Sequence, residues 1–295
     1  MLTLSLVNIT QAQACERIVS LSPSTTDSLD ALGLGDKIVG FTRYCQLEHP
    51  NKSIKAPQVI GGFTDLSLET VFLTRPSIIF GGNSANNTAL ENLGFKVVVH
   101  PQQSLQDIED GVRIIATACN IKEKGEQVIE KYRASLAELK PAQDSNMRVL
   151  ILYGYEETNG NLSSMYGAGV SYHADILKLL GLKNAYTGSL SAPILSQESI
   201  LAINPDIIFV LSSEPQAASV AIDKFKAAFK LNEADPKMRD PFLLVAYKVE
   251  PQWQMLMQVN ALKNNKVYEI VGRDSVMPSI RLVYLAKLMA QLIAN

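Results

Sequence analysis

The sequence predicts an α/β protein built from two Rossmann-like lobes with mostly parallel sheets. Short apolar segments of strand length alternate with segments of helical period along most of the 295 residues. In addition, residues 66–80 (LSLETVFLTRPSIIF) align without a gap with residues 195–209 (LSQESILAINPDIIF), and seven of these fifteen positions are identical. A repeat offset by 129 residues is too long for a solenoid unit, so it indicates two similar lobes.

The segment between the two repeats, residues 122–140, has the pattern of one long amphipathic helix. Charged residues cover one face, and Pro141 is expected to end the helix. At 1.5 Å per residue the helix is about 28 Å long, which is the width of a small domain. The apolar stripe on its other face consists of Val128, Ile129, Tyr132, Leu136 and Leu139.

The N-terminal lobe is expected to contain short buried strands separated by helices. The expected strands are Arg17–Leu21, Lys37–Thr42, Gln58–Ile60, Ser77–Phe80 and Lys96–His100. The expected helices are Thr25–Leu32, Ser67–Leu73, Thr88–Leu93 and Leu105–Cys119. Gly33 and Gly35 are expected to end the first of these helices.

The C-terminal lobe restarts with a strand at Arg148–Tyr153, and a polar loop with Tyr155 and Tyr166 is expected after it. The further expected strands are Ile207–Leu211, Leu243–Ala246 and Val267–Ile270. The further expected helices are Tyr172–Leu180, the repeated helix with Glu198, Asp223–Phe229 and a closing helix at Arg281–Ile293. The expected domains are therefore a signal segment at 1–14, an N-terminal lobe at 15–119, a connecting helix at 120–141 and a C-terminal lobe at 142–295.

Composition and motifs exclude several classes of function. The net charge is −2 with scattered Lys and Arg, which gives no nucleic-acid footprint. No P-loop, G-x-S-x-G elbow or H-E-x-x-H motif occurs, and Gly167-x-Gly169 lacks the third glycine of a dinucleotide site. The three histidines show no metal-ligand spacing, so neither a metal site nor a resident cofactor is expected.

The N-terminal residues 1–14 resemble the apolar region and A-x-A cleavage site of a secretory signal. We therefore expect export to the periplasm. No Lys or Arg follows Met1 directly, which leaves a truncated signal or a frayed N-terminus as alternatives. Cys15 comes directly after Ala14, so lipid attachment at Cys15 is a further alternative, and one that the preceding residues match poorly.

The three cysteines are too few for a disulfide framework. Cys15 precedes the first expected strand, and Cys119 ends a helix that runs back antiparallel to the strands, so both are expected at one edge of the N-terminal lobe. Cys45 follows the second strand and is expected at the opposite edge. If a disulfide forms in an oxidising compartment, we expect it to join Cys15 and Cys119.

Ligands of parallel α/β sheets bind at the carboxyl ends of the strands. If two lobes face one another, the loops at these ends lie across a ligand cleft between them. The residues that we expect on the ligand are Ser22, Pro23, Arg43, Tyr44, Phe63, Gly82, Asn83, Tyr155, Tyr166, Ser212 and Arg281. An α/β enzyme with its active site in the same cleft is the alternative class.

Four segments, RIVSLSPSTTDSLDALGLGDKIVGFTRY, GGFTDLSLE, GGN and NPDIIFVLSS, resemble the periplasmic binding proteins of ABC importers for iron chelates and cobalamin. These proteins form the class with one rigid connecting helix, and the resemblance covers Arg17–Asn295. It implies a monomeric carrier without catalysis that delivers a small molecule to an ABC permease. Glu69 and Glu198 occupy the same position in the two copies of the internal repeat. The resemblance also implies that these two glutamates dock onto arginines of the permease.

The resemblance further implies that Tyr44 and the turn at Phe63 face the ligand. A cobalamin carrier is expected to have a tryptophan near Gly61–Phe63, and the single tryptophan, Trp253, lies elsewhere. Arg43 and Arg281 are natural partners for an anionic iron chelate, because guanidinium binds carboxylate or catecholate oxygens in a bidentate way. The ligand therefore remains an iron chelate or a corrinoid, with a haem or Zn/Mn carrier of the same fold as alternatives.

Overall fold

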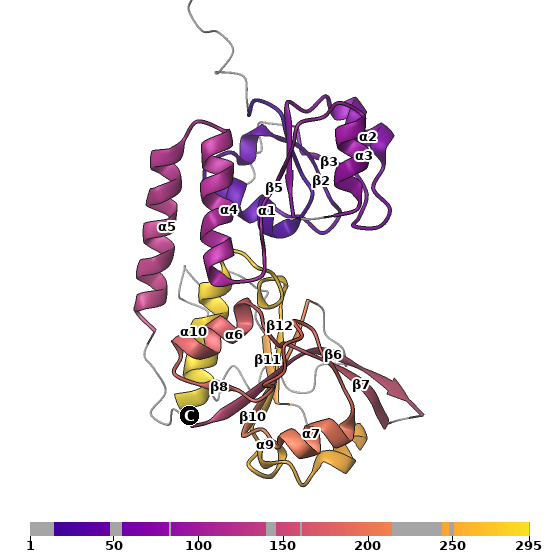
Figure 1. Ribbon diagram of the computed structural model, residues 1–295, viewed down its shortest axis with the longest axis vertical. Coiled ribbons are helices and arrows are strands. Elements are labelled where there is room, and N and C mark those ends of the chain that lie inside the picture. The colour runs from indigo at the N-terminus through magenta and orange to yellow at the C-terminus, as the bar shows by residue number, and fades with distance from the viewer. Residues whose placement is uncertain are drawn as a thin grey trace, which may run out of the picture. The chain divides into compact units, whose positions relative to one another are not determined.

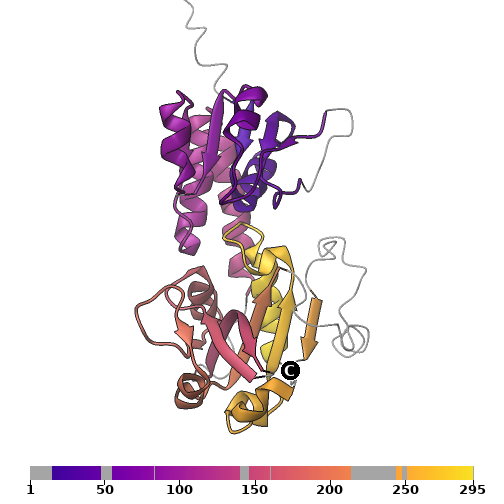
Figure 2. The ribbon, with the colours of Figure 1, turned by 90° about the vertical axis from the view of Figure 1, so that its right-hand side faces the viewer.

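The computed structural model describes residues 15–47, 55–82, 84–139, 146–159, 161–213, 244–247 and 251–294. The expected signal segment, the helix expected at 223–229, His49 and Asn83 lie outside these residues. The chain divides into two compact units (Figures 1 and 2). Unit 1 comprises the residues up to Gln102 together with Gln106–Ala134, and unit 2 comprises Gln103–Leu105 and the residues from Ser135 onwards. The predicted α/β fold class is confirmed.

Unit 1 is built on a five-stranded parallel sheet, sheet A, with the strand order β3-β2-β1-β4-β5. Its strands are β1 (Ile18–Ser20), β2 (Ile38–Phe41), β3 (Gln58–Val59), β4 (Ile78–Gly81) and β5 (Val97–Val99). The elements that connect them are α1 (Pro23–Ala31), the 3₁₀ turn η1 (Gly35–Lys37), α2 (Leu68–Thr74) and α3 (Asn86–Asn92). Figure 1 shows α1 on one face of sheet A and α2 and α3 on the other, as right-handed crossovers require.

The order of the strands reverses at β1, because the chain first adds β2 and β3 on one side and later β4 and β5 on the other. The loops that leave β1 and β4 therefore diverge and open a crevice at the carboxyl edge of the sheet. Beneath this edge β1 and β4 are buried on both faces. The apolar cluster between sheet A and its helices consists of Val19, Leu21, Ile60, Val71, Ile79 and Leu90.

The internal repeat is also a structural repeat. Ser67 caps α2 and accepts a hydrogen bond from the Thr70 backbone N–H at 3.2 Å. In unit 2, Ser196 caps α7 (Gln197–Ile203) in the same way, with Ser199 as the donor at 3.2 Å. Both helices then end in the left-handed conformation, at Arg75 (φ 46°) and at Asn204 (φ 46°). These paired residues are all 129 positions apart, so the repeated sequence encodes the same helix with the same start and the same end.

After sheet A the chain forms two antiparallel helices, α4 (Leu105–Ala118) and α5 (Lys122–Ala137). Gly125 allows close contact, because a Cβ atom there would lie 2.6 Å from the Cβ of Ala116. Arg133 Nε donates to Glu109 Oε1 at 2.8 Å and links the two helices further along. The helix α5 ends at Ala137, earlier than the expected Lys140.

Cys15 and Cys119 form a disulfide, with their Cα atoms 5.4 Å apart and 104 positions between them in the sequence. It ties the start of β1 to the turn between α4 and α5. Cys45 is a buried free thiol whose Sγ lies 3.1 Å from Thr42 Oγ1. Burial raises the pKa of this thiol, so Cys45 behaves as a small apolar side chain.

The described residues of unit 2 form a seven-stranded mixed sheet, sheet B, with the order β11-β12-β10-β6-β7-β9 and with β8 paired to β6. Its strands are β6 (Arg148–Thr158), β7 (Asn161–Gly167), β8 (Lys183–Asn184), β9 (Ile194–Leu195), β10 (Ile207–Ser212), β11 (Leu244–Tyr247) and β12 (Val267–Val271). Besides α7, its helical elements are α6 (Tyr172–Leu179), η3 (Pro251–Leu256), α9 (Asn260–Lys263), η4 (Arg273–Ser275) and α10 (Leu282–Ala294). The strands β6, β10 and β12 form a parallel centre like that of sheet A.

The prediction of a polar loop after Tyr153 is wrong, because these residues form a β-hairpin. The strand β6 continues to Thr158 and pairs antiparallel with β7, which contains Tyr166. Asn159 has a φ of 54°, as expected for a tight hairpin turn. The dipeptide Asn159-Gly160 in the sequence is a strong signal for such a turn.

Candidate functional site

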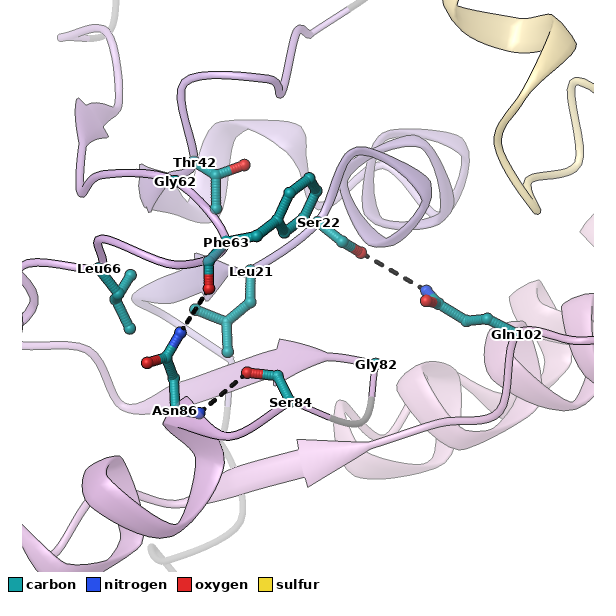
Figure 3. A pocket seen from close by; sticks show the side chains of 10 residues that line it. All are labelled: Leu21, Ser22, Thr42, Gly62, Phe63, Leu66, Gly82, Ser84, Asn86 and Gln102. Carbon is teal, nitrogen blue, oxygen red and sulfur yellow. Dashed lines mark hydrogen bonds between the residues drawn. The ribbon is translucent and has the colours of Figure 1, made fainter. Parts of the chain in front are cut away.

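A pocket of about 190 Å³ opens in unit 1 at the carboxyl edge of sheet A (Figure 3). It lies where the loops after β1, β2, β4 and β5 meet, which is the crevice that the strand order predicts. Its lining residues are Leu21, Ser22, Thr42, Gly62, Phe63, Leu66, Gly82, Ser84, Asn86 and Gln102. None of these residues carries a charge, and the charged pair of Arg43 and Asp65 lies beside Gly62 at the margin of the pocket.

The polar wall of the pocket is formed at the first turn of α1. Ser22 has an extended backbone (φ −151°) and caps α1, and Pro23 occupies the first turn of that helix. Gln102 Nε2 donates to Ser24 Oγ at 2.7 Å and makes a longer contact of 3.5 Å with Ser22 Oγ. Figure 3 shows Ser22 and Gln102 pointing toward one another across the pocket. The hydroxyl of Ser22 and the amide of Gln102 are therefore placed to meet polar atoms of a ligand.

The aromatic rim of the pocket consists of Phe63 and Tyr44. Their rings stack with centroids 4.9 Å apart and an angle of 12° between the planes. Both side chains are about half exposed, at 54% and 46%. The turn that carries Phe63 is held by Asn86, whose Nδ2 donates to the Phe63 carbonyl at 3.0 Å. A flat apolar surface of this kind suits a planar or macrocyclic ligand.

Arg43 is paired with Asp65 by two hydrogen bonds, one of them from Nη1 to Oδ1 at 2.9 Å. This bidentate pair raises the pKa of Arg43 and lowers the pKa of Asp65. The guanidinium also lies over the ring of Tyr44, 5.8 Å from its centroid. Arg43 thus supports the aromatic rim, and its charge is already balanced by Asp65.

The predicted ligand role of Arg281 is not supported by its position. Its residue surface is only 6% exposed, and its Nε donates to Asp274 Oδ2 at 2.6 Å. Its guanidinium also packs 5.5 Å from the centroid of the Tyr284 ring. The charge of Arg281 is therefore already balanced by a buried partner, and its guanidinium is not exposed to an anionic ligand.

The two predicted tyrosines of unit 2 lie on the hairpin. Tyr155 packs against the apolar core, with its ring edge-on to Trp253 at 5.8 Å between centroids. Tyr166 donates a hydrogen bond to Glu156 Oε1 at 2.5 Å, which raises the pKa of the tyrosine. Ser212 ends β10, and its buried Oγ has no hydrogen-bond partner among the described residues.

A buried polar chain lies at the carboxyl edge of sheet B. His173 is fully buried; its Nδ1 lies 2.8 Å from Tyr153 Oη and its Nε2 lies 2.7 Å from the Ser275 carbonyl. The carbonyl can only accept, so Nε2 carries the proton and Nδ1 accepts from Tyr153. Burial lowers the pKa of His173 to about 4. The imidazole is therefore neutral at physiological pH.

The structure gathers only part of the predicted site in one place. Ser22, Phe63 and Gly82 line the pocket, Tyr44 and Arg43 stand beside it, and the unit 2 residues belong to a different unit. Sequence reasoning missed the lining residues Leu21, Thr42, Gly62, Leu66, Ser84, Asn86 and Gln102. The signal for Gln102 was present, because it closely follows the strand β5 at the same sheet edge.

Two properties of the described residues bear on other classes of function. They contain no group of three or more His, Cys, Asp or Glu side chains placed to hold a metal ion. No helix in these parts of the chain is long and apolar enough to cross a membrane.

A profile of the family described as periplasmic binding protein matches residues 18–273. The chain belongs to this family. The similarity spans the strands and helices of both units, from β1 to η4.

Relatives of this binding protein include vitamin B12-binding proteins. The one from Vibrio vulnificus (strain YJ016) is 26% identical over 205 residues, which cover 68% of this chain and 72% of the relative. The one from Yersinia pestis (strain Pestoides F) is 25% identical over 217 residues, covering 71% of this chain and 74% of the relative.

Solved structures share the fold of this binding protein. A possible iron-binding periplasmic solute-binding protein from Staphylococcus epidermidis has a TM-score of 0.67 at 22% identity and covers 95% of this chain and 99% of its own. The periplasmic haem-binding protein of Vibrio cholerae also has a TM-score of 0.67, at 20% identity and with 95% and 99% covered. The periplasmic vitamin B12-binding protein of Vibrio cholerae has a TM-score of 0.61 at 19% identity, with 94% and 96% covered. Since these proteins have different ligands, the fold does not select among them.

Proposed function

We propose that this binding protein captures a corrinoid in the periplasm and delivers it to an ABC permease. The observation that carries the choice of ligand is the lining of the unit 1 pocket, which contains no charged side chain. The peripheral amides of a corrinoid match the hydroxyl of Ser22 and the amide of Gln102, and its ring matches the stacked Tyr44 and Phe63. The names of the curated relatives support the same ligand class.

An anionic iron chelate fits this lining less well. The arginines predicted to bind it are Arg43, whose charge is balanced by Asp65, and Arg281, which is buried with Asp274. Binding of a catecholate or citrate complex would require Arg43 to exchange one carboxylate for another. The two histidines among the described residues, His100 and His173, are both buried and hydrogen-bonded within the protein, so neither is open to a haem iron.

Calorimetric titration of the purified mature protein tests the ligand class. The panel is cyanocobalamin, a neutral ferric hydroxamate, a ferric catecholate, ferric citrate, haemin and free Zn²⁺. We expect cyanocobalamin to bind most tightly and without chemical change. Tighter binding of ferric citrate or the catecholate would refute the argument from the uncharged lining, and turnover of any ligand would identify an enzyme.

Two variants connect the binding to the pocket. Phe63→Ala removes a half-exposed ring from the rim, and we expect the dissociation constant for cyanocobalamin to rise about tenfold or more, since stacked aromatic groups carry a large share of such interfaces. Val59→Ala is the matched control, because Val59 is equally exposed at 53% but does not line the pocket. Equal effects of the two substitutions would remove Phe63 from the site.

The delivery step is supported by the repeated helices. Glu69 and Glu198 occupy the same position in the first turns of α2 and α7, and both are exposed. One turn further along, Phe72 and Leu201 are exposed at 64% and 36%. A carboxylate beside an apolar side chain, repeated once in each unit, suits docking onto basic and apolar groups of a two-subunit permease.

A further inference from the structure

The pocket wall at Ser22 is connected to a buried histidine. His100 follows β5 and is 5% exposed, and its Nε2 lies 3.0 Å from Thr25 Oγ1. Thr25 Oγ1 in turn lies 2.7 Å from Ser22 Oγ. The chain of contacts therefore runs from His100 through Thr25 to a hydroxyl that lines the pocket.

The proton positions along this chain follow from its two ends. His100 Nδ1 lies 3.4 Å from the Pro101 carbonyl, which can only accept, so Nδ1 carries the proton of the neutral ring. Nε2 is then an acceptor and takes the Thr25 hydroxyl proton. With that proton committed, Thr25 Oγ1 accepts the single hydroxyl proton of Ser22 at 2.7 Å, a shorter contact than the 3.1 Å to the other neighbouring hydroxyl, Ser24 Oγ. Ser22 Oγ also accepts from the Thr25 backbone N–H at 3.3 Å, and its remaining lone pair faces Gln102 Nε2 at 3.5 Å, a long contact that a ligand donor can replace.

A second feature shows that the position of His100 is built into the fold. The ring packs against Gly111 in the interior of α4, where a Cβ atom would lie 2.8 Å from His100 Nδ1. Glycine in a helix interior costs about 1 kcal/mol relative to alanine. The atoms nearest to such a Cβ all belong to the His100 ring. The ring is buried and has no room to move aside, so Gly111 is required for its position.

We infer that His100 is a specificity-determining positioning residue: through Thr25 it orients the Ser22 hydroxyl so that Ser22 presents a hydrogen-bond acceptor to the pocket. The ligand groups that this wall selects are donors, such as primary amides. When His100 gains a proton, Nε2 becomes a donor, Thr25 donates to Ser22, and Ser22 turns its own proton away from Thr25. The wall then presents a donor, and affinity for an amide N–H falls. This inference rests on the proposed function for the identity of the ligand.

The pH range of this change depends on the surroundings of the ring. Burial lowers the pKa of His100 from its usual 6.5, and the Pro101 carbonyl raises it in part. The acidic side chains on the two helices against the ring are Asp27 and Asp30 on α1 and Asp107, Glu109 and Asp110 on α4, and the basic one is Arg113 on α4. Burial is the largest cause of the shift, so the change takes place below pH 6.5.

The test begins on the ligand-free protein. Nitrogen NMR of the histidine rings at pH 7.5 reports which nitrogen of His100 is protonated, and we expect Nδ1. Thr25→Val removes the hydroxyl between His100 and Ser22, so we expect the Nε2 resonance to shift. Thr26→Val is the matched control, because Thr26 is buried one position along α1 and donates to Ser20 and to the Ser22 carbonyl instead. A protonated Nε2 at pH 7.5 would overturn the inference whether or not any ligand binds.

The second measurement is the dissociation constant for cyanocobalamin between pH 5 and 8. In the wild type and in Thr26→Val we expect affinity to fall about five- to tenfold as His100 is protonated, which corresponds to one lost hydrogen bond. In Thr25→Val we expect a flat profile at an intermediate affinity. A pH profile in Thr25→Val that is as steep as in the wild type would refute the relay. Absence of binding at every pH would refute the proposed ligand and leave the NMR result to decide the relay.

Discussion

Removal of the Cys15–Cys119 disulfide is expected to be among the most destabilising single changes outside the core. The bond joins residues 104 positions apart. In the chain-entropy description, a cross-link that closes a loop of about 100 residues lowers the entropy of the unfolded chain enough to stabilise the native state by about 4.7 kcal/mol. Cys119→Ser should remove most of this stabilisation, because Ser keeps the size of the side chain and disturbs little else.

The assay is urea unfolding of the wild type and of Cys119→Ser, each with and without a thiol reductant. We expect the wild type in reductant to unfold at the same urea concentration as Cys119→Ser, and at a clearly lower concentration than the oxidised wild type. Cys45→Ser is the control, because Cys45 is a free thiol and should show no dependence on reductant beyond that of the wild type. If the oxidised wild type and Cys119→Ser unfold together, the bond either does not form or contributes nothing.

Three further outcomes are expected. Reversal of Glu69 and Glu198 to Lys should abolish ligand uptake by cells while leaving calorimetric affinity unchanged; a loss of affinity would contradict the docking role. Gly125→Ala should destabilise the protein by about 1–3 kcal/mol, because its Cβ would lie 2.6 Å from the Ala116 Cβ, and Ala116→Gly should rescue it in a double-mutant cycle. Burial lowers the pKa of His173 to about 4, so as pH falls this histidine gains a proton in the unfolded chain before it does in the folded protein. The free energy of unfolding should therefore decline below pH 6.5, by up to about 3 kcal/mol. His173→Gln should flatten that decline.

The fold was predictable because its determinants are local and repeated. Apolar runs bounded by turn residues located the strands of sheet A, and the serine caps Ser67 and Ser196 lie inside the repeat that the sequence displays. The prediction failed at the hairpin of β6 and β7. There the tyrosines and glutamates between 153 and 166 resemble a polar loop, while their pairing across Asn159-Gly160 makes them strand residues.

The site was predictable only as far as the sheet-edge rule reaches. That rule brings Ser22, Phe63 and Gly82 to the lining of one pocket, because each lies in a loop that follows a strand of sheet A. It cannot show which charged side chains are already paired. Asp274 lies seven positions before Arg281, and only the structure shows that the two are buried together.

The pairing of Arg43 with Asp65 bears on how the unit 1 pocket would select a ligand under the proposed function. With Arg43 unpaired, selection would depend on charge, and an anionic iron chelate would be the natural ligand. With Arg43 bonded to Asp65, the proposal has selection depend on shape and on the direction of individual hydrogen bonds. The flat rim of Tyr44 and Phe63 supplies the first. The direction of a hydrogen bond depends on which of the two atoms carries the proton. The hydroxyl of Ser22 can donate or accept until a neighbouring group fixes the position of its proton. A buried neutral histidine at the other end of the chain is a group that can do so, and this is why we connect the chemistry of the pocket to His100.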